Sequence, residues 1–534
     1  MKKLALFVSL VVLCFSFAFA GCSSRRVHID GVTVTGNKPS FETGNMFEAE
    51  DIKEYYSTNN AMYVLLDSPF VGKNSVFIKK MGKDIVITSA GTYILKGTLN
   101  GRVVVDAGVE DKIKLVFDGV VINSPNGVAL NIISAKKVIL TLATETVNEL
   151  SAINYEYITD FGSVLRSTCD LTINGEGSLN IIAPNGDGIE CDKTLKLVNG
   201  KISIKAEADG IEVKESFRLK NSALTIEAEK DGVNVKNKED NKLGFVYVEN
   251  GTFDIKSGDD CISASSNLRI DNGIFNLFAG KESTNNNTSQ KALKADTGII
   301  INNGNFVINS VGDGIHSDDS ISIFDGKFVI ETSDDAVHSD AKLLVAGGEF
   351  NILNCYEGLE GLTLEILDGD IDIYSLDDAI NTKEPPNGVA DGTNRDIIIS
   401  GGSITIRSDV DGIDSGGNIY ISGGDISVCC PSLTHTAIVD FVGVCVVSGG
   451  TFFATGVFSV GGAFQNSEQA YLYAYLTQQN AGETVRISTR SGEVLKEVVT
   501  GGVVKLVVYS SGELIRGKEY VVECGNDSTI VQAL

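Results

Sequence analysis

The sequence lacks tryptophan and has little proline, histidine or basic charge. Its 534 residues include 7 prolines, 4 histidines and no tryptophan, and 44 Lys+Arg stand against 70 Asp+Glu, which gives a net charge of −26. Without tryptophan, the flat indole platform used by many cellulose-binding modules is excluded. The acidic excess argues against binding to phosphate backbones, so we expect no nucleic-acid partner. The 57 glycines with so few prolines indicate tight turns between short strands.

The N-terminus has the pattern of an export leader. Two lysines precede an apolar stretch from Leu4 to Phe17, which is short for a membrane span. Two processing sites compete, namely cleavage after Ala20 and a lipobox-like Phe19–Cys22 in which Cys22 becomes the lipidated first residue. The serines after Cys22 favour the second. We therefore predict a signal peptide over 1–21 and a protein that is lipid-anchored on the extracellular side of the cell membrane, with secretion as the alternative. Membrane contact is expected only through the lipid.

Ten cysteines would ordinarily suggest disulfides in an exported chain. One lies in the leader and another is Cys22, and the remaining eight are spread through strand-like segments without C-x-x-C spacing. We predict that these eight are buried as small hydrophobic side chains, and not paired in disulfides or bound to zinc.

A motif of one acidic, one small and one apolar residue recurs along the chain. Its copies include Asp187-Gly188-Ile189, Asp209-Gly210-Ile211, Asp231-Gly232-Val233, Asp313-Gly314-Ile315, Asp335-Ala336-Val337, Glu357-Gly358-Leu359, Asp378-Ala379-Ile380 and Asp411-Gly412-Ile413. In most copies a turn glycine such as Gly326 follows eleven residues after the apolar residue, and the next acid follows nine residues later. The period is therefore 22 residues. Residues between the markers alternate, as in Phe328-Val329-Ile330, which is typical of strands.

Units this short cannot enclose a core alone, but stacked units pair strand on strand around one apolar interior. We therefore predict an all-β fold: a right-handed parallel β-helix of about 22-residue coils with a small C-terminal antiparallel β domain. The expected order is an N-terminal cap over 25–81 with a short helix within 47–56, the β-helix over 82–462 and the β domain over 463–534. Insertions at 236–243, 281–290 and 383–395 should leave the stack as loops.

Stacking would place the motif acids in one line, which we call the acidic column. Its ten positions are Asp187, Asp209, Asp231, Asp260, Lys291, Asp313, Asp335, Glu357, Asp378 and Asp411. Neighbouring charges about 5 Å apart repel by roughly 1 kcal/mol even in water, so each acid either caps its own turn or helps to bind a cation. For the cation we predict Ca²⁺, which takes six to eight oxygen ligands. The candidate ligands are Asp259, Asp260, Asp313, Asp318, Asp334, Asp335, Asp340, Glu357, Glu360, Asp377, Asp378, Asp411 and Asp414.

Two histidines lie beside this column. His316 and His338 are 22 residues apart, so they should occupy the same place on adjacent coils, and Glu360 follows in register. Two interpretations stay open, a surface stack beside carboxylates and a transition-metal site. Lys291 and Lys294 interrupt the acidic residues, which indicates charge balance.

The same segments resemble a known family. The runs Val311–Asp318, Ser333–Asp340, Tyr356–Gly361 and Asp377–Asn381 are similar to those of the carbohydrate-binding domain-containing β-helix family of clostridial surface proteins. That family is similar in shape to family 9 pectate lyases. The resemblance implies calcium-bearing coils, a secreted or lipoprotein location, and binding of cellulose and polygalacturonan. Lyase activity is not the family's usual property.

Three functions follow from these observations. The first is a non-catalytic, calcium-dependent surface lipoprotein that binds plant cell-wall polysaccharide, with Tyr356, Tyr374 and Tyr420 as candidate sugar platforms. The second is a pectate-lyase-like polysaccharide lyase, in which a neutral basic side chain removes a proton beside the uronate carboxyl group. For that role we can nominate only Lys291, Lys294, Lys383 and Arg395, and we assign no catalytic residue. The third is a structural or adhesive cell-surface protein.

Overall fold

The computed structural model describes residues 44–68, 77–125, 127–152, 162–280, 289–383, 392–431, 437–458, 464 and 466–534. The predicted signal peptide, Cys22 and the first part of the predicted cap lie outside these residues. The described chain consists of strands and turns with one short helix, so the all-β prediction is confirmed. Within the described ranges, no helix has the length and apolarity needed to cross a membrane.

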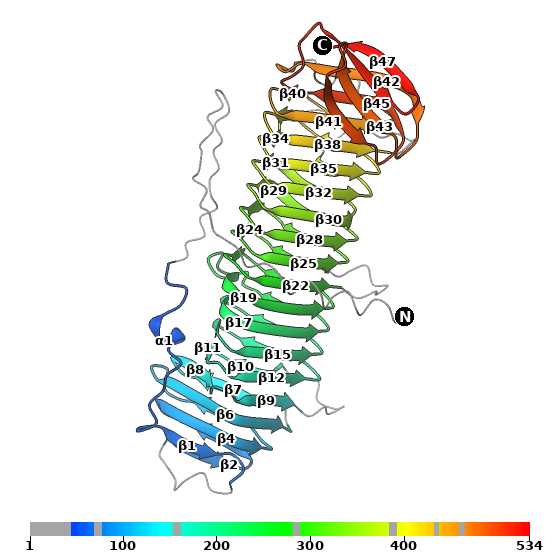
Figure 1. The fold of residues 1–534 in the computed structure, drawn as a ribbon. Coiled ribbons are helices and arrows are strands. Elements are labelled where there is room, and N and C mark those ends of the chain that lie inside the picture. The colour runs from blue at the N-terminus through cyan, green and yellow to red at the C-terminus, as the bar shows by residue number, and fades with distance from the viewer. Residues whose placement is uncertain are drawn as a thin grey trace, which may run out of the picture. The chain divides into compact units, whose positions relative to one another are not determined.

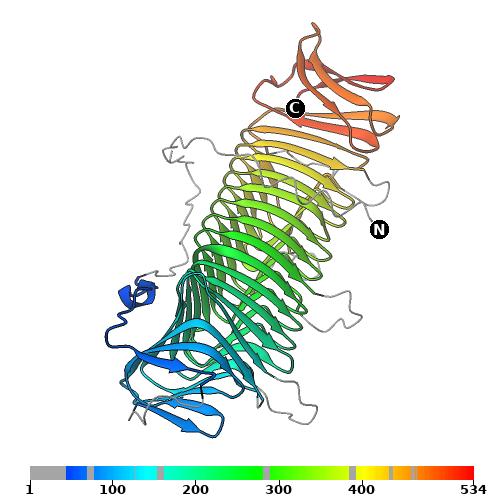
Figure 2. The same ribbon diagram turned by 60° about the horizontal axis from the view of Figure 1, so that its bottom comes forward.

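The strands stack into three parallel sheets around one apolar interior, in a helix-like arrangement (Figure 1, Figure 2). The first sheet carries the acidic motif. Its strands in order are β3 (Asp84–Ile87), β5 (Val103–Asp106), β7 (Leu130–Ser134), β10 (Ser163–Ser167), β13 (Asp187–Cys191), β16 (Ile211–Val213), β18 (Val233–Val235), β20 (Ile262–Ala264), β23 (Leu293–Ala295), β26 (Ile315–Ser317), β29 (Val337–Val345), β31 (Leu359–Ile366), β33 (Ile380–Thr382), β36 (Ile413–Ser415) and β39 (Val439–Phe441).

Several long strands pass from one sheet into the next, and β29 and β31 continue from the first sheet into the second. The second sheet also contains β1 (Met62–Leu65), β4 (Gly91–Leu99), β6 (Lys112–Ser124), β8 (Lys137–Leu142), β11 (Asp170–Asn174), β14 (Thr194–Val198), β17 (Ser216–Ala228), β19 (Phe245–Ser257), β21 (Asn267–Ile270), β24 (Gly298–Ile301), β27 (Ser320–Ile323), β34 (Ile397–Ile399), β37 (Ile419–Ile421) and β40 (Cys445–Val447).

The third sheet receives the second halves of β4, β6, β17 and β19. Its other parallel strands are β9 (Val147–Ala152), β12 (Ser178–Ala183), β15 (Lys201–Ala206), β22 (Ile274–Ala279), β25 (Asn305–Ser310), β28 (Lys327–Thr332), β30 (Glu349–Cys355), β32 (Asp370–Ser375), β35 (Ser403–Ser408), β38 (Asp425–Cys430) and β41 (Thr451–Gly456). Inward side chains alternate with outward ones along strands such as β25 and β28, as the period of two predicts.

The register between neighbouring first-sheet strands follows the repeat. Ile189 pairs with Ile211, and Ile315 pairs with Val337, each 22 residues further along. The difference grows to 29 residues between β18 and β20 and to 33 between β33 and β36, where the predicted insertions fall. The pairing on either side of the insertions is therefore preserved, and residues 281–288 and 384–391 of the predicted insertions lie outside the described residues.

Stacked phenylalanines and a close backbone approach hold the coils together. Phe253, Phe275, Phe306, Phe328 and Phe350 form a continuous buried pile with ring centroids 4.5–4.7 Å apart. The small residue of the motif sits where two coils meet. A Cβ added at Gly210 would lie 2.6 Å from the carbonyl oxygen of Gly232, which explains why the motif tolerates only small side chains there.

The eight predicted buried cysteines are all unpaired thiols, and only Cys429 is partly exposed. The prediction that they act as small hydrophobic side chains is confirmed.

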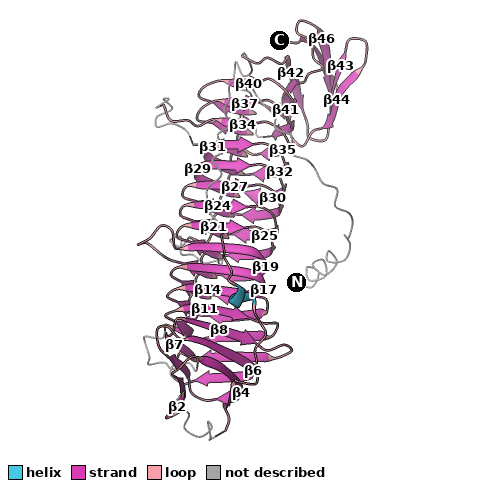
Figure 3. Cartoon of the chain, turned by 90° about the vertical axis from the view of Figure 1, so that its left-hand side faces the viewer, coloured by secondary structure: helices cyan, strands magenta, loops and turns pink. Residues whose placement is uncertain are grey.

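The segment before β1 lies against the side of the stack. Its helix α1 (Ala49–Ile52) is shorter than predicted, and Figure 3 shows it beside β14 and β17. Asp51 is fully buried and forms ion pairs of 2.7 Å with both Lys137 on β8 and Lys196 on β14. The start of the stack is instead occupied by β1 and by the antiparallel hairpin of β2 (Ile78–Met81) with β3.

The C-terminal strands divide between two sheets. The strands β43 (Thr484–Thr489), β44 (Val494–Val499), β46 (Glu519–Cys524) and β47 (Asp527–Gln532) form a small antiparallel sheet, as predicted. The other two, β42 (Tyr471–Gln479) and β45 (Val504–Ser510), extend the third sheet instead, because β45 pairs antiparallel with β41. Pairing with β45 covers an edge that would otherwise be exposed at the last coil.

Candidate functional site

Most acids of the acidic column link their coil to the next through a hydrogen bond. Oδ1 of Asp187 accepts the backbone N–H of Asp209 at 2.9 Å. The same hydrogen bond joins Asp209 to Asp231, Asp231 to Asp260, Asp260 to Lys291, Asp313 to Asp335, Asp335 to Glu357 and Asp378 to Asp411. The expectation that each acid caps its own turn is therefore corrected, since the capped N–H belongs to the neighbouring coil. One carboxylate oxygen is used in this way, and the second remains for another partner.

Burial makes the carboxylates of the acidic column costly to ionise. It raises the pKa of seven of them above the usual range: Asp335 and Asp411 to about 6, Asp187, Asp231 and Asp378 to about 7, Glu357 to about 8, and Asp260 in the same direction. Like charges on adjacent coils add to the effect of burial. Protons or cations must offset this repulsion for the column to remain stacked at neutral pH.

Basic side chains supply that compensation only in part of the column. Lys291, the one basic residue among its positions, forms an ion pair with Asp313 on the next coil. Although burial opposes it, the contacts with His316 and Lys291 hold the pKa of Asp313 well below its usual range. Lys236 lies 3.5 Å from Asp209, and Lys294 lies 3.9 Å from Asp260. The two lysines that interrupt the acids, Lys291 and Lys294, therefore act as counterions.

A second line of outward side chains runs beside the acidic column, and we call it the adjacent column. It lies one residue after the motif's apolar residue and contains Arg166, Glu190, Glu212, Asn234, Ser263, Lys294, His316, His338, Glu360, Asn381, Asp414 and Asp440. Sequence reasoning recognised its middle, from His316 to Glu360. It missed Asn234 and Asn381, whose amides donate to acids of the acidic column, although the same spacing would have found them.

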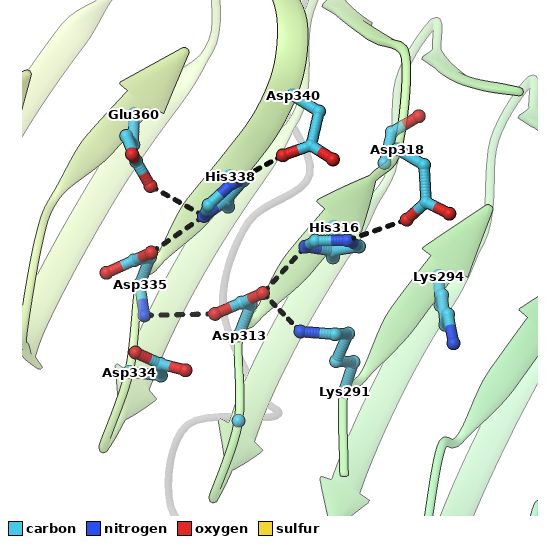
Figure 4. A network of polar contacts seen from close by, with 12 residues as sticks. Lys291, Lys294, Asp313, His316, Asp318, Asp334, Asp335, His338, Asp340 and Glu360 are labelled. Atoms are coloured by element: carbon cyan, nitrogen blue, oxygen red, sulfur yellow. Dashed lines mark hydrogen bonds and ion pairs between the residues drawn. The ribbon is translucent and has the colours of Figure 1, made fainter. Parts of the chain in front are cut away.

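Both histidines have carboxylates at each ring nitrogen (Figure 4). His316 places Nδ1 2.7 Å from Asp313 Oδ2 and Nε2 3.0 Å from Asp318 Oδ1. His338 places Nδ1 2.8 Å from Asp335 Oδ2 and Nε2 3.2 Å from Asp340 Oδ1.

Glu360 adds a further carboxylate at His338, with Oε2 2.6 Å from Nδ1. Burial alone would lower the pKa of His338, but the carboxylates of Asp335 and Glu360 outweigh it and raise the pKa to about 11. The ring centroids of His316 and His338 are 5.0 Å apart, as expected for side chains in register on adjacent coils.

The acids further along the column have a different environment. Glu357, Asp378 and Asp411 all lie close enough to Asp377 for its charge to raise their pKa values. Among the described residues, no lysine, arginine or histidine forms an ion pair with these three carboxylates. Asn381 donates to Glu357 Oε2 at 2.8 Å. This part of the column therefore presents only oxygen ligands without a basic counterion, which is the donor chemistry that Ca²⁺ prefers.

The structure does not bring all the predicted calcium ligands into one site. Asp259 and Asp260 precede β20, whereas Asp411 and Asp414 belong to β36 and the turn before it, several coils away. Oxygens of Asp313, Asp334 and Asp335 lie within 4.8 Å of one another. Asp318 and Asp340 are exposed and point toward the histidines, and Glu360 reaches the same cluster. Glu357, Asp377, Asp378 and Asp411 form the second group.

The residues nominated for a lyase are not gathered at one place. Lys291 and Lys294 contact carboxylates as described above, Arg395 is buried, and Lys383 is exposed beyond β33.

The candidate tyrosines are also dispersed. Tyr356 is exposed next to the acidic column, and its hydroxyl donates a hydrogen bond to the Asp377 carboxylate. Tyr374 lies on the third sheet against Arg407, and Tyr420 lies on β37 of the second sheet. The three tyrosines therefore do not form a common sugar platform.

Comparison with known proteins places these coils in a family. A family model described as carbohydrate-binding domain-containing protein matches residues 81–336 and 334–440. A protein of Acetivibrio thermocellus with the same description is 43% identical over 194 residues, which is 35% of this chain and 68% of that protein. A solved structure, the gadolinium derivative of a polysaccharide lyase-like protein from C. thermocellum, is 26% identical. It covers 50% of this chain and 96% of its own, with a TM-score of 0.38.

Proposed function

The chain belongs to the family of carbohydrate-binding domain-containing proteins, and from this premise we propose that it is a non-catalytic, calcium-dependent polysaccharide-binding protein of the cell surface. The proposed ligand is a plant cell-wall polysaccharide, cellulose or polygalacturonan. The proposal includes export through the leader over 1–21, anchoring through a lipid on Cys22, and right-handed winding of about 22-residue coils. The register differences of 22 residues support that coil length.

One observation carries the calcium part of the proposal, namely the uncompensated carboxylates around Asp377. Glu357, Asp378 and Asp411 have raised pKa values, and the described residues place no basic side chain on them. We propose that Ca²⁺ is held by these carboxylates together with Asp377. Bound Ca²⁺ would supply positive charge that can bridge the protein to uronate carboxylates of an acidic polysaccharide, which an acidic protein alone would repel.

The position of this group on the outward side of the stack suits a polymer. The acids lie on successive coils of the first sheet, so a bound chain could contact several coils at once. Asp414 and Asp440 continue the adjacent column beyond Asn381 and add further oxygens on this side. A long ligand therefore has repeated, evenly spaced contacts available instead of a single pocket.

Retention on a polygalacturonate gel tests the proposal. The purified protein is applied in Ca²⁺ and, separately, in chelator, and the supernatants are assayed for unsaturated uronide. We expect retention only with Ca²⁺, no unsaturated product, and at least a tenfold loss of retention for Asp378→Asn. Asp372→Asn is the matched control, because Asp372 is exposed on β32 of the third sheet.

Two outcomes would contradict the proposal. Unsaturated product would replace it with the lyase alternative. Absence of Ca²⁺-dependent retention on both polygalacturonate and cellulose would leave a structural or adhesive role.

A further inference from the structure

The two histidine rings are held from outside by carboxylates. Nε2 of His338 lies 3.2 Å from Asp340 Oδ1, and Nε2 of His316 lies 3.0 Å from Asp318 Oδ1. An ionised carboxylate can only accept a hydrogen bond, so Nε2 of His338 keeps its proton when a metal ion replaces the proton on Nδ1. Protein metal sites commonly orient histidine ligands in this way, with the remote nitrogen donating to a carboxylate. The same contact between Nε2 and a carboxylate occurs on two successive coils.

The other ring nitrogen of His338, Nδ1, faces two carboxylate oxygens. Nδ1 is 2.8 Å from Asp335 Oδ2 and 2.6 Å from Glu360 Oε2 (Figure 4). Once the proton on Nδ1 is lost, this nitrogen and the two carboxylates can serve as three ligands, and their ligand atoms lie within 4.8 Å of one another. A single proton on Nδ1 can be directed well at only one of the two carboxylates, whereas a cation can contact all three groups. At His316, by contrast, Nδ1 has a single carboxylate partner, with Asp313 Oδ2 2.7 Å away.

The nature of the donors selects the class of ion. Ca²⁺ favours oxygen ligands throughout, whereas an imidazole nitrogen with carboxylates suits first-row transition metals such as zinc. Tetrahedral Zn²⁺ with bonds of about 2.0–2.1 Å needs donor atoms about 3.3 Å apart, so the cluster would open by roughly half an ångström. Both His338 and Glu360 are only partly buried, which leaves room for this movement.

Two overlapping sets of donors share His338. One set is Asp335, His338 and Glu360, and the other is Asp313, His316 and His338, each with donor atoms within 4.8 Å of one another. In the second set the Lys291 ammonium already contacts Asp313 Oδ2. The first set has no lysine or arginine ion pair among the described residues.

From this geometry we propose that Asp335, His338 and Glu360 form a binding site for one divalent transition-metal ion, such as Zn²⁺, separate from the calcium positions around Asp377. The proposed site assigns Asp335 and Glu360 to this ion, whereas the sequence predicted them as calcium ligands. It does not rest on the polysaccharide proposal. Binding displaces a proton from His338, because the ion takes the place at Nδ1 where the proton otherwise sits between the carboxylates.

Titration of the purified, chelator-treated protein with Zn²⁺ in the presence of excess Ca²⁺ tests the site. We expect one saturable ion that releases about one proton, measured by calorimetry in buffers of different ionisation enthalpy. His338→Asn and Glu360→Gln should each weaken Zn²⁺ binding by at least tenfold, because each variant removes one of the proposed ligands. His316→Asn is the matched control one coil earlier, and we expect it to change the affinity by less than threefold.

A second measurement distinguishes this site from nonspecific metal binding elsewhere on the acidic surface. Co²⁺ replaces Zn²⁺, and its visible d–d absorption should appear with wild type and His316→Asn but not with His338→Asn. Asp378→Asn should leave the absorption unchanged, so a failure of the calcium proposal would be visible separately. Equal Zn²⁺ affinity in wild type and His338→Asn would overturn the proposal, as would loss of binding in His316→Asn alone. Melting temperatures of all variants confirm that they are folded.

Discussion

Asp378→Asn should stabilise the calcium-free protein at alkaline pH, although it removes a residue of the acidic column. Burial raises the pKa of Asp378 to about 7 from an ordinary value of 3.8. Oδ1 of Asp378 accepts the backbone N–H of Asp411 at 2.9 Å, and an asparagine amide oxygen can accept the same bond. The substitution therefore removes the charge and keeps the link between coils.

The sign and size of the effect follow from proton linkage. A folded-state pKa above the unfolded value means that the native state binds more protons between pH 4 and pH 7. The stability that Asp378 contributes is therefore fully present below about pH 4 and is lost as the pH rises through 7. A pKa difference of about three corresponds to roughly 4 kcal/mol, which is an upper limit because Asp378 is not fully buried.

The assay is thermal unfolding in chelator at pH 4 and pH 8. With about 2.1 cal/mol/K per residue over roughly 450 described residues, 4 kcal/mol corresponds to an increase of about 4 °C at pH 8, and no difference is expected at pH 4. Saturating Ca²⁺ should raise the melting temperature of the wild type and leave the variant unchanged, which reverses their order. Asp372→Asn is the control, with a change within about 0.5 kcal/mol. A variant less stable than wild type at pH 8 in chelator would refute the claim that Asp378 is an uncompensated charge.

Three further predictions concern the scaffold. Phe306→Ala should lower stability by about 3–5 kcal/mol, seen as a fall in melting temperature, because it leaves a cavity in the middle of the phenylalanine pile; an unchanged melting temperature would mean that the neighbouring rings close the gap. Asp51→Ala should lower the free energy of unfolding by about 3 kcal/mol, because the buried Lys196 loses its ion pair while Lys137 keeps only Glu48 and Glu50. Limited proteolysis should then cleave the segment 44–56 first, and equal protection of that segment in both proteins would contradict this. Gly210→Ala should also lower the free energy of unfolding, because the added methyl group would meet Ile226 and the backbone of the next coil. Denaturant unfolding measures this change, and a stability equal to that of the wild type would show that the coils can separate locally.

The repeat made much of the architecture predictable. The alternation of residues and the regular markers are local patterns, so they identified parallel strands, the positions of the insertions and the pairing of His316 with His338 and Glu360. A small antiparallel sheet near the C-terminus was also expected from the sequence. Stacking converts sequence spacing directly into spatial register, and this is why so much followed from one chain.

Contacts that do not recur with the 22-residue repeat could not be predicted from the sequence. Nothing local marks Asp51 as the buried partner of Lys137 and Lys196, which lie far along the chain, or β45 as the strand that covers β41. Spacing placed Lys291 in the acidic column, but only the structure shows its ammonium on Asp313 of the next coil.

The chemistry of the candidate site divides in the same way. The sequence by itself determined which side chains share a column, because a 22-residue repeat of parallel strands leaves no other register. The tertiary structure decided which carboxylates are compensated by lysine or histidine, which nitrogen of His338 faces Asp335 and Glu360, and which acids around Asp377 remain without a basic partner in the described chain. These depend on side-chain direction and burial between coils, and sequence spacing specifies neither.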